Sequence, residues 1–229
     1  GSGLQNRYSS VQIRVPPLLM FLYYFTKIVA GLVFRILFPV KVKGSEHFPK
    51  KGAVILVANH CSYFDPLYLA LAIPRKTNWM VLRPYYDLWW LRWFFKSINS
   101  IPVNIKGPNI EAIKYSLRIL KQGKVLGIFP EGSRSKNGRS KEGEPGAALL
   151  ALKSGAPIFP VAIQGAFEVF PPHARLPHAF RRVKVRLGSP LHLARINKEP
   201  INKEALQIAT AQIMKSIEKL MEESEEKKG

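Results

Sequence analysis

Residues 53–70 read AVILVANHCSYFDPLYLA, and this stretch passes from an apolar run through a polar loop to a second apolar run. The first run is short and almost continuously apolar, which is typical of a strand covered on both faces. Pro66 suits the first position of a helix, and Asp65 directly before it is a favourable N-cap. We therefore predict a strand, a loop that contains His60, and a helix that Asp65 caps.

The same alternation of strand and helix recurs along the chain. Apolar runs predict further strands at 77–83, 100–105, 125–132 and 158–165, and helical patterns cover 66–72, 109–122, 145–154 and 201–226. This alternation predicts an α/β fold with a mixed, largely parallel central sheet flanked by helices. Residues 183–188 alternate between apolar and polar, and we expect this strand at an edge of the sheet.

The N-terminal part of the chain has a different character. Residues 11–40 are mostly apolar, but Lys27 and Arg35 interrupt them. The longest uncharged stretch there, residues 15–26, is shorter than the roughly 20 apolar residues that a spanning helix needs. We predict a membrane-binding pair of helices that lie in the interface, while a buried helix pair and a transmembrane span remain alternatives.

This leader, residues 4–43, is also basic, since no acidic residue occurs before Glu46. The 229 residues include 35 Lys and Arg against 15 Asp and Glu, a formal net charge of +20. Such a charge predicts an anionic partner: nucleic acid, a lipid headgroup surface or a phosphorylated substrate. An apolar, basic leader favours an anionic membrane over nucleic acid, and the chain has no Gly-rich phosphate loop or RNA-type aromatic-basic signature. We expect one α/β domain, residues 44–229, after the leader.

His60 and Asp65 are the first candidate functional pair. Five positions apart, they would not meet easily within one helix, but they can meet across a loop. A carboxylate on one imidazole nitrogen leaves the other nitrogen free to take a proton from a hydroxyl. General base catalysis of this kind contributes about 10²- to 10⁴-fold. The alternative is structural: Asp65 only caps its helix, and His60 only satisfies loop carbonyls.

A second candidate stretch, GIFPEGSRS at 127–135, ends another apolar strand in a polar turn. Arg134 in this turn could bind a phosphate with its forked guanidinium. An arginine beside turn glycines is more often a solvated loop residue, so this stretch alone is a weak signal.

Together the two stretches have a specific order. An apolar strand leads to Asn-His-x-x-x-x-Asp-Pro, Phe-Pro-Glu-Gly-x-Arg-Ser follows about 65 residues later, and then comes IFPVAIQG at 158–165. This order resembles the glycerolipid acyltransferase family over about residues 44–188. The leader is similar to the membrane-binding helix pair of that family.

The resemblance implies that a fatty acyl group passes from a thioester of acyl carrier protein or coenzyme A to the sn-2 hydroxyl of 1-acylglycerol 3-phosphate (lysophosphatidic acid), giving phosphatidic acid. His60 would be the general base and Asp65 its orienting partner. The hydroxyl would attack the thioester directly, with no metal, no cofactor and no covalent acyl-enzyme. The acceptor-phosphate site would comprise Glu131, Gly132, Ser133 and Arg134. Pro160 would lie on the acyl-donor side.

The resemblance also implies a monotopic enzyme on the cytoplasmic face of the inner membrane. Another lysophospholipid or a glycerol phosphate remains an alternative acceptor. A basic nucleic-acid-binding module without catalysis is the alternative from a different functional class.

The second block of the family departs from its usual form in this chain. The family commonly has a Pro-Val-Asp-Arg strand end whose basic residue contacts phosphate, whereas this chain reads IPVNIK at 101–106. Lys106 is displaced by one place from the usual arginine. Either Lys106 or Arg83 is therefore a candidate for the phosphate contact.

Aromatic residues are concentrated in 83–95, where Tyr86, Trp89, Trp90 and Trp93 recur at helical spacing. This spacing predicts one apolar helix face, which is usually part of a core. The functional alternative is a helix that contacts the membrane or lines the acyl-chain tunnel. Cys61, the only cysteine, is expected to point away from His60 rather than to act as a nucleophile.

Overall fold

The computed structural model describes residues 17–89, 92–97, 99–105, 109–194, 196 and 201–225. Within them a seven-stranded sheet has the order β1-β7-β6-β2-β5-β3-β4. Its strands are β1 (Val40–Lys43), β2 (Val54–Ala58), β3 (Thr77–Leu82), β4 (Ile101–Val103), β5 (Val125–Ile128), β6 (Ile158–Gln164) and β7 (Val183–Leu187). Five neighbouring pairs are parallel, and only β6 and β7 are antiparallel. The predicted α/β fold with a mixed, largely parallel sheet is confirmed.

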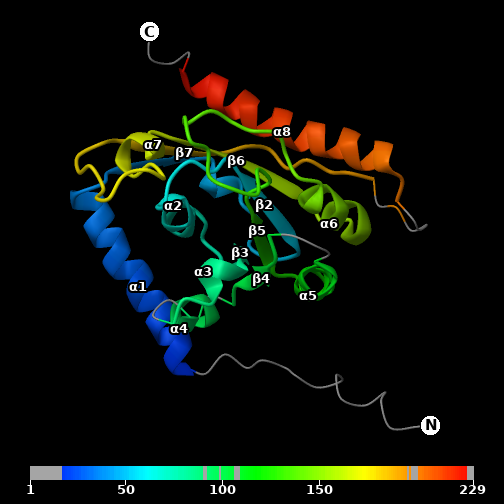
Figure 1. Ribbon diagram of the computed structural model, residues 1–229, viewed down its shortest axis with the longest axis horizontal. Helices are drawn as coiled ribbons and strands as arrows, with labels where there is room; N and C mark the ends of the chain where they lie inside the picture. The colour runs from blue at the N-terminus through cyan, green and yellow to red at the C-terminus, as the bar shows by residue number, and fades with distance from the viewer. Residues whose placement is uncertain are drawn as a thin grey trace.

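Helices cover both faces of this sheet (Figure 1). One face packs against α2 (Asp65–Ala72) and α7 (Ala166–Val169), and α1 (Pro17–Ile36) lies outside them against α2 and α4 (Arg92–Ser97). The other face packs against α5 (Ile110–Lys121), α6 (Gly146–Ser154) and α8 (Lys203–Glu225). Two short helices, η1 (Ser45–His47) and α3 (Arg83–Tyr86), complete the described elements. Central strands therefore bury both faces, which explains their unbroken apolar sequences.

The strand predicted at the edge lies inside the sheet. β7 pairs with β6 on one side and with β1 on the other. The partner that covers it, Val40–Lys43, has the sequence VKVK and comes from the stretch assigned to the leader. The prediction was wrong because β7 does alternate buried and half-buried residues, but a strand supplied from far away in the sequence pairs with it.

Within the described part of the leader, one helix, α1, runs from Pro17 to Ile36. No helix in the described part of the chain is both long and apolar enough to cross a bilayer. Residues 1–16 lie outside the described residues, so a second helix of the leader stays a prediction.

The aromatic stretch does not form the single helix that its spacing suggested. α3 and α4 are separate helices, and a turn directly follows α3, in which the Leu88 N–H donates to the Tyr85 carbonyl. Trp89 in this turn is 85% exposed and Trp93 is 46% exposed, so neither is a core residue. Tyr86 stacks on Phe95, and Trp90 lies outside the described residues.

Gly127 in β5 makes space beneath the candidate site. It lies opposite Trp79 in β3, and a Cβ atom there would be 2.4 Å from the Trp79 ring. The freed space lets the Trp79 ring stack on Phe129 at a centroid distance of 5.4 Å, and Phe129 in turn stacks on His60 at 4.0 Å. Glycine at position 127 thus allows the ring packing that holds the His60 imidazole in place.

We expect Gly127→Ala to lower the free energy of unfolding by about 1–3 kcal/mol, because the added methyl group overpacks this stack. Gly146→Ala is the matched control, since a Cβ atom there meets nothing within 4 Å and the site is helical. That control should be neutral or slightly stabilising. Urea unfolding of both variants checks the prediction, and equal stabilities would contradict it.

Candidate active site

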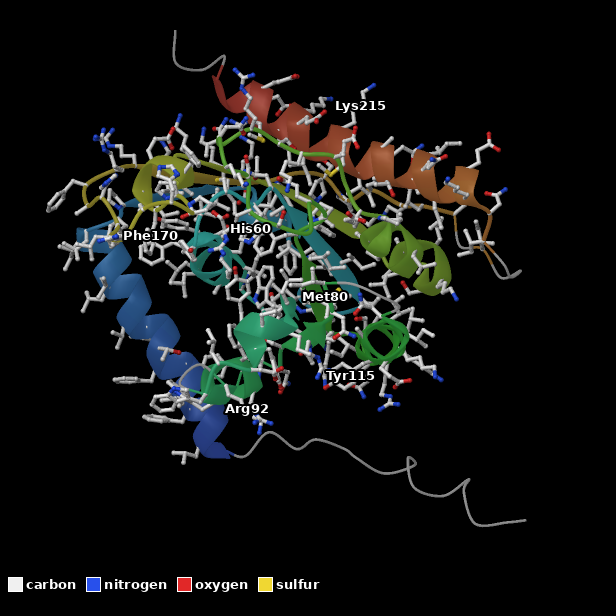
Figure 2. The ribbon with its side chains drawn as sticks, viewed as in Figure 1. His60, Met80, Arg92, Tyr115, Phe170 and Lys215 are labelled. Atoms are coloured by element: carbon white, nitrogen blue, oxygen red, sulfur yellow. The ribbon has the colours of Figure 1, made fainter. Side chains whose placement is uncertain are left out.

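The candidate residues gather at one edge of the sheet. β2, β3, β4 and β5 are parallel, so their carboxyl ends meet there, which is where α/β sheets bind ligands. His60 follows β2, Arg83 follows β3, and residues 131–134 follow β5. Figure 2 shows His60 close to α2 at this edge.

Asp65 binds the His60 ring and also orders the loop between them. Its Oδ2 lies 2.8 Å from His60 Nδ1, and the same oxygen accepts the N–H groups of Cys61 and Ser62 at 2.7 and 2.8 Å. Asp65 is fully buried, whereas the His60 side chain is 17% exposed. Because Nδ1 faces a carboxylate, it carries the ring proton, and Nε2 keeps its lone pair for another partner.

This geometry corrects the predicted capping role of Asp65. The helix begins at Asp65 itself, Phe64 occupies the N-cap position, and no side chain caps the helix. The carboxylate instead turns back onto the preceding loop, where three N–H donors satisfy Oδ2.

The two motif loops hold each other through the backbone of His60. The His60 N–H donates to Glu131 Oε1 at 3.0 Å, and the His60 carbonyl accepts the Ser135 N–H at 2.8 Å. The Phe129 ring stacks on the imidazole with an interplanar angle of 16°. The stretch after β5 therefore fixes both the main chain and the ring plane of His60.

Asn59 is a structural residue that the sequence analysis missed. Its side chain donates to the Ile163 carbonyl at 2.9 Å and accepts the Ile163 N–H at 2.7 Å. These bonds continue the pairing of β2 with β6 past the end of β2. The sequence did contain a signal for this role, because Asn59 is a polar residue at the end of an otherwise apolar strand, directly before His60.

Arg134 is held between two aromatic rings. Its guanidinium carbon lies 3.7 Å from the centre of the Tyr63 ring and 5.4 Å from that of Tyr85. The guanidinium also donates a 2.8 Å hydrogen bond to the Tyr85 hydroxyl. Cation–π contacts and this bond orient the fork before any ligand arrives. Sequence reasoning missed both tyrosines, since nothing local connects them to Arg134.

Glu131 is a buried carboxylate in this region. Burial raises its pKa to about 7, opposed by the His60 N–H and the nearby charge of Lys141, while Asp65 contributes a smaller rise. Its neighbours Gly132 and Ser133 are exposed: Gly132 takes a positive φ in the turn, and the Ser133 hydroxyl accepts a bond from Lys141 Nζ at 2.6 Å.

Cys61 does not have the properties of a nucleophile. It is buried, and burial followed by the charges of Asp65 and Glu131 raises the pKa of its thiol far above the usual range. Burial and Asp65 likewise raise the pKa of the Tyr68 hydroxyl. These shifts make Cys61 and Tyr68 unsuited to proton transfer near neutral pH.

The remaining candidates are placed differently. Arg83 is exposed at the start of α3, two residues from Tyr85. Lys106 lies outside the described residues. Pro160 is buried in β6 opposite Val57, whose side chain belongs to the core beneath α5, α6 and α8. The His60–Phe129–Trp79 stack packs with the core of the opposite face, so the structure does not bring Pro160 to the His60 ring.

The described part of the site contains no cluster of ligands suited to a metal ion. Among the residues that the structure describes, no three His, Cys, Asp or Glu side chains are grouped as metal ligands would be. The described residues of the two motif loops supply an imidazole with its carboxylate and a guanidinium that contacts two phenol rings. This set offers a base and an anion-binding group.

The chain is similar in sequence to bacterial acyltransferases. The chain is 29% identical over 185 residues to a 1-acyl-sn-glycerol-3-phosphate acyltransferase of Bacillus subtilis, covering 79% of this chain and 87% of that protein. It is 27% identical over 205 residues to the Streptococcus pneumoniae protein of the same name, covering 86% and 73%.

A solved structure shares the fold. The crystal structure of the 1-acyl-sn-glycerophosphate acyltransferase PlsC from Thermotoga maritima matches with a TM-score of 0.66 at 24% identity, covering 89% of this chain and 80% of that one. The family model described as Acyltransferase matches residues 39–164, which include His60, Asp65 and Arg134. This chain therefore belongs to the acyltransferase family.

Proposed function

We propose that the protein transfers a fatty acyl group from an acyl thioester to the sn-2 hydroxyl of 1-acylglycerol 3-phosphate, giving phosphatidic acid. The observation that carries this proposal is the His60–Asp65 pair, bonded at 2.8 Å, with Arg134 in the adjoining loop. Family membership and the names of the bacterial relatives support it. The donor carries its acyl group on acyl carrier protein or coenzyme A.

In the proposed reaction His60 Nε2 takes the proton of the acceptor hydroxyl as the hydroxyl oxygen attacks the thioester carbonyl. Asp65 holds the Nδ1 proton and stabilises the imidazolium that forms. When the tetrahedral intermediate collapses, the carbon–sulfur bond breaks and the thiolate takes the proton back from the imidazolium. The products are the ester and a free thiol, and His60 returns to its starting state.

Arg134 is the proposed ligand of the acceptor phosphate. A guanidinium presents paired N–H groups that match a phosphate, and the two tyrosines hold it in one orientation. Arg83, exposed near Tyr85, and Lys106 are further basic residues proposed for the same anion.

Glu131 is proposed as a positioning residue of this site. A carboxyl group donates no paired N–H bonds to a phosphate, and Oε1 of this one already accepts the His60 N–H. Its role is to hold the two loops together, while Gly132 and Ser133 form the exposed turn that leads to Arg134. Pro160 remains proposed on the acyl-donor side only by its place in the family's fourth block.

The membrane is the proposed location of the reaction. Exposed apolar side chains recur along α1 at helical spacing; they include Leu18, Phe21, Phe25, Ile28, Leu32 and Ile36. A helix with such a face binds in the headgroup region of a bilayer. We propose monotopic binding to the anionic cytoplasmic face of the inner membrane, where lysophosphatidic acid resides.

Replacement of His60 tests the base. His60→Ala should lower the rate of thiol release from the acyl thioester by about 10²- to 10⁴-fold, because the variant lacks the proposed general base. Asp65→Asn should also lower kcat, since the imidazolium loses its counter-charge. Unchanged circular dichroism and vesicle binding are the controls. A His60→Ala protein with wild-type turnover would refute the mechanism.

Replacement of Arg134 tests the phosphate contact. Arg134→Ala should raise the KM for 1-acylglycerol 3-phosphate by roughly 10- to 100-fold, the effect of losing a charged hydrogen bond. Tyr85→Phe, which keeps the ring and removes the hydroxyl, should raise KM by only a few-fold. Arg118→Ala, at an exposed position on α5, is the matched control. Equal KM changes for the phosphate-bearing acceptor and for uncharged monoacylglycerol would contradict phosphate recognition by Arg134.

Glu131 should make stability depend on pH. Its folded pKa of about 7 lies above the ordinary value of 4.5, so ionisation of the buried group destabilises the fold as pH rises through this window. Glu131→Gln lacks this effect. Its stability relative to wild type should therefore increase by about 1–3 kcal/mol between pH 5 and pH 8, measured by urea unfolding. Exposed Glu142→Gln should show no such change, and a pH-independent difference for Glu131→Gln would contradict the prediction.

A further inference from the structure

We propose that residues 171–182 form a second lipid-binding element, the 171–182 loop, which inserts two apolar side chains into an anionic bilayer surface beside α1. The inference rests on the proposed function, because it assigns a further contact to an enzyme that works at a membrane. It concerns a segment between α7 and β7 that takes no direct part in the proposed chemistry.

The composition and exposure of the 171–182 loop suit such a surface. Its sequence, PPHARLPHAFRR, contains no acidic residue. Leu176 is 76% exposed and Phe180 is 74% exposed, although both are large apolar side chains. Arg175, Arg181 and Arg182 are exposed beside them. Apolar side chains flanked by arginines match a bilayer whose acyl region lies beneath anionic phosphates.

The backbone at Phe180 is held in an unfavourable conformation. Its φ of 61° lies in the left-handed region, which a bulky residue rarely adopts. Its N–H donates to the Leu37 carbonyl at 2.6 Å, and the nearby His178 N–H donates to the Val169 carbonyl at 2.7 Å. These bonds maintain a strained turn that leaves an aromatic ring in water. Strain kept at an exposed apolar residue points to a functional contact.

The 171–182 loop continues the apolar face of α1. Leu37, which accepts the Phe180 N–H, directly follows the last residue of that helix. Ile36 is 63% exposed and Leu37 is 37% exposed. In Figure 1 the yellow segment between α7 and β7 runs beside this end of α1. The helix and the loop thus present adjoining apolar groups to one partner.

Hydrogen bonds connect the start of the loop to the catalytic loop. The Phe170 carbonyl accepts the Ser62 hydroxyl at 3.0 Å and the Tyr63 N–H at 3.2 Å, and the Tyr63 hydroxyl donates to the Pro172 carbonyl at 3.4 Å. Tyr63 is the residue whose ring lies against Arg134. Phe170 in Figure 2 lies near the end of α1. A bilayer bound to the 171–182 loop would therefore lie at a fixed position relative to the site.

A bilayer fits these groups better than nucleic acid does. The phosphates of a nucleic acid could bind the arginines. In a duplex, however, the bases are stacked inside the helix, so contacts to the backbone would leave Leu176 and Phe180 exposed to water. An acyl layer removes both from water. Full burial of a side chain of this size strengthens binding by about tenfold or more, and each arginine near anionic headgroups does so about fivefold.

The test labels position 180 with an environment-sensitive fluorophore. Cys61 is buried, so NBD attaches selectively to Phe180→Cys in the 229-residue chain. Ile208→Cys, at an exposed apolar position on α8, is the matched control. Vesicles of phosphatidylglycerol and phosphatidylcholine should shift the NBD emission to the blue and raise it severalfold at 180, with no change at 208. Pure phosphatidylcholine vesicles should give a much smaller response.

Three outcomes would overturn the inference. They are no shift at 180 while vesicles still sediment the protein, an equal shift at 208, and a shift produced by RNA as strongly as by vesicles. The fluorescence requires no turnover. A protein that shows the emission shift at 180 but releases no thiol from the acyl thioester would refute the proposed function alone. A protein that releases thiol normally but shows no emission shift would refute the lipid contact alone.

A binding measurement on unlabelled protein gives the magnitude. Leu176→Ser combined with Phe180→Gly, in which glycine also relieves the strained turn, should lower partitioning to anionic vesicles by about tenfold or more. Arg181→Gln with Arg182→Gln should lower it by roughly 25-fold at low salt. The double variants should keep wild-type thiol release on a short-chain acceptor in solution. Partitioning equal to that of wild type would overturn the inference.

Discussion

A single carboxylate oxygen, Oδ2 of Asp65, organises the site on which the rest of the molecule's chemistry depends. Three N–H donors meet at this atom: the imidazole and two backbone amides of the loop between His60 and Asp65. Hydrogen bonds to a buried carboxylate are strong. Because all three donors share one acceptor atom, these bonds fix the loop conformation and the ring orientation together. The imidazole proposed as the base is therefore oriented by the same atom that orders its loop.

The sheet provides the second constraint. Because β2 lies between β5 and β6, the loop after β5 can bind the main chain of His60 while Asn59 extends the pairing with β6. The same loop delivers Arg134 to the pair of tyrosines. The proposed base and the proposed phosphate ligand are thus joined by one set of backbone bonds, which suits the proposed reaction, in which a phosphate positions a hydroxyl.

The exposed apolar surface gives this site its proposed setting. α1 carries an apolar face, and the 171–182 loop adds Leu176 and Phe180 beside the end of that helix. Water disfavours such groups, and a bilayer removes them from it. Phe170, directly before this loop, accepts bonds from Ser62 and Tyr63, and Pro172 in the loop accepts one from the Tyr63 hydroxyl. We infer from these bonds that membrane binding and the placement of the loop that carries His60 are structurally connected.

The sequence by itself determined the local structure: the alternation of apolar runs and helical patterns predicted the α/β sheet, and the stretch around His60 predicted the base at a strand-to-helix loop. It assigned VKVK to the leader and Asp65 to a cap, and it did not connect Glu131 to His60 or Tyr85 to Arg134. Those features were decided by the tertiary structure. Hydropathy patterns record the burial of neighbouring residues, whereas strand order and loop direction set which distant polar atoms meet.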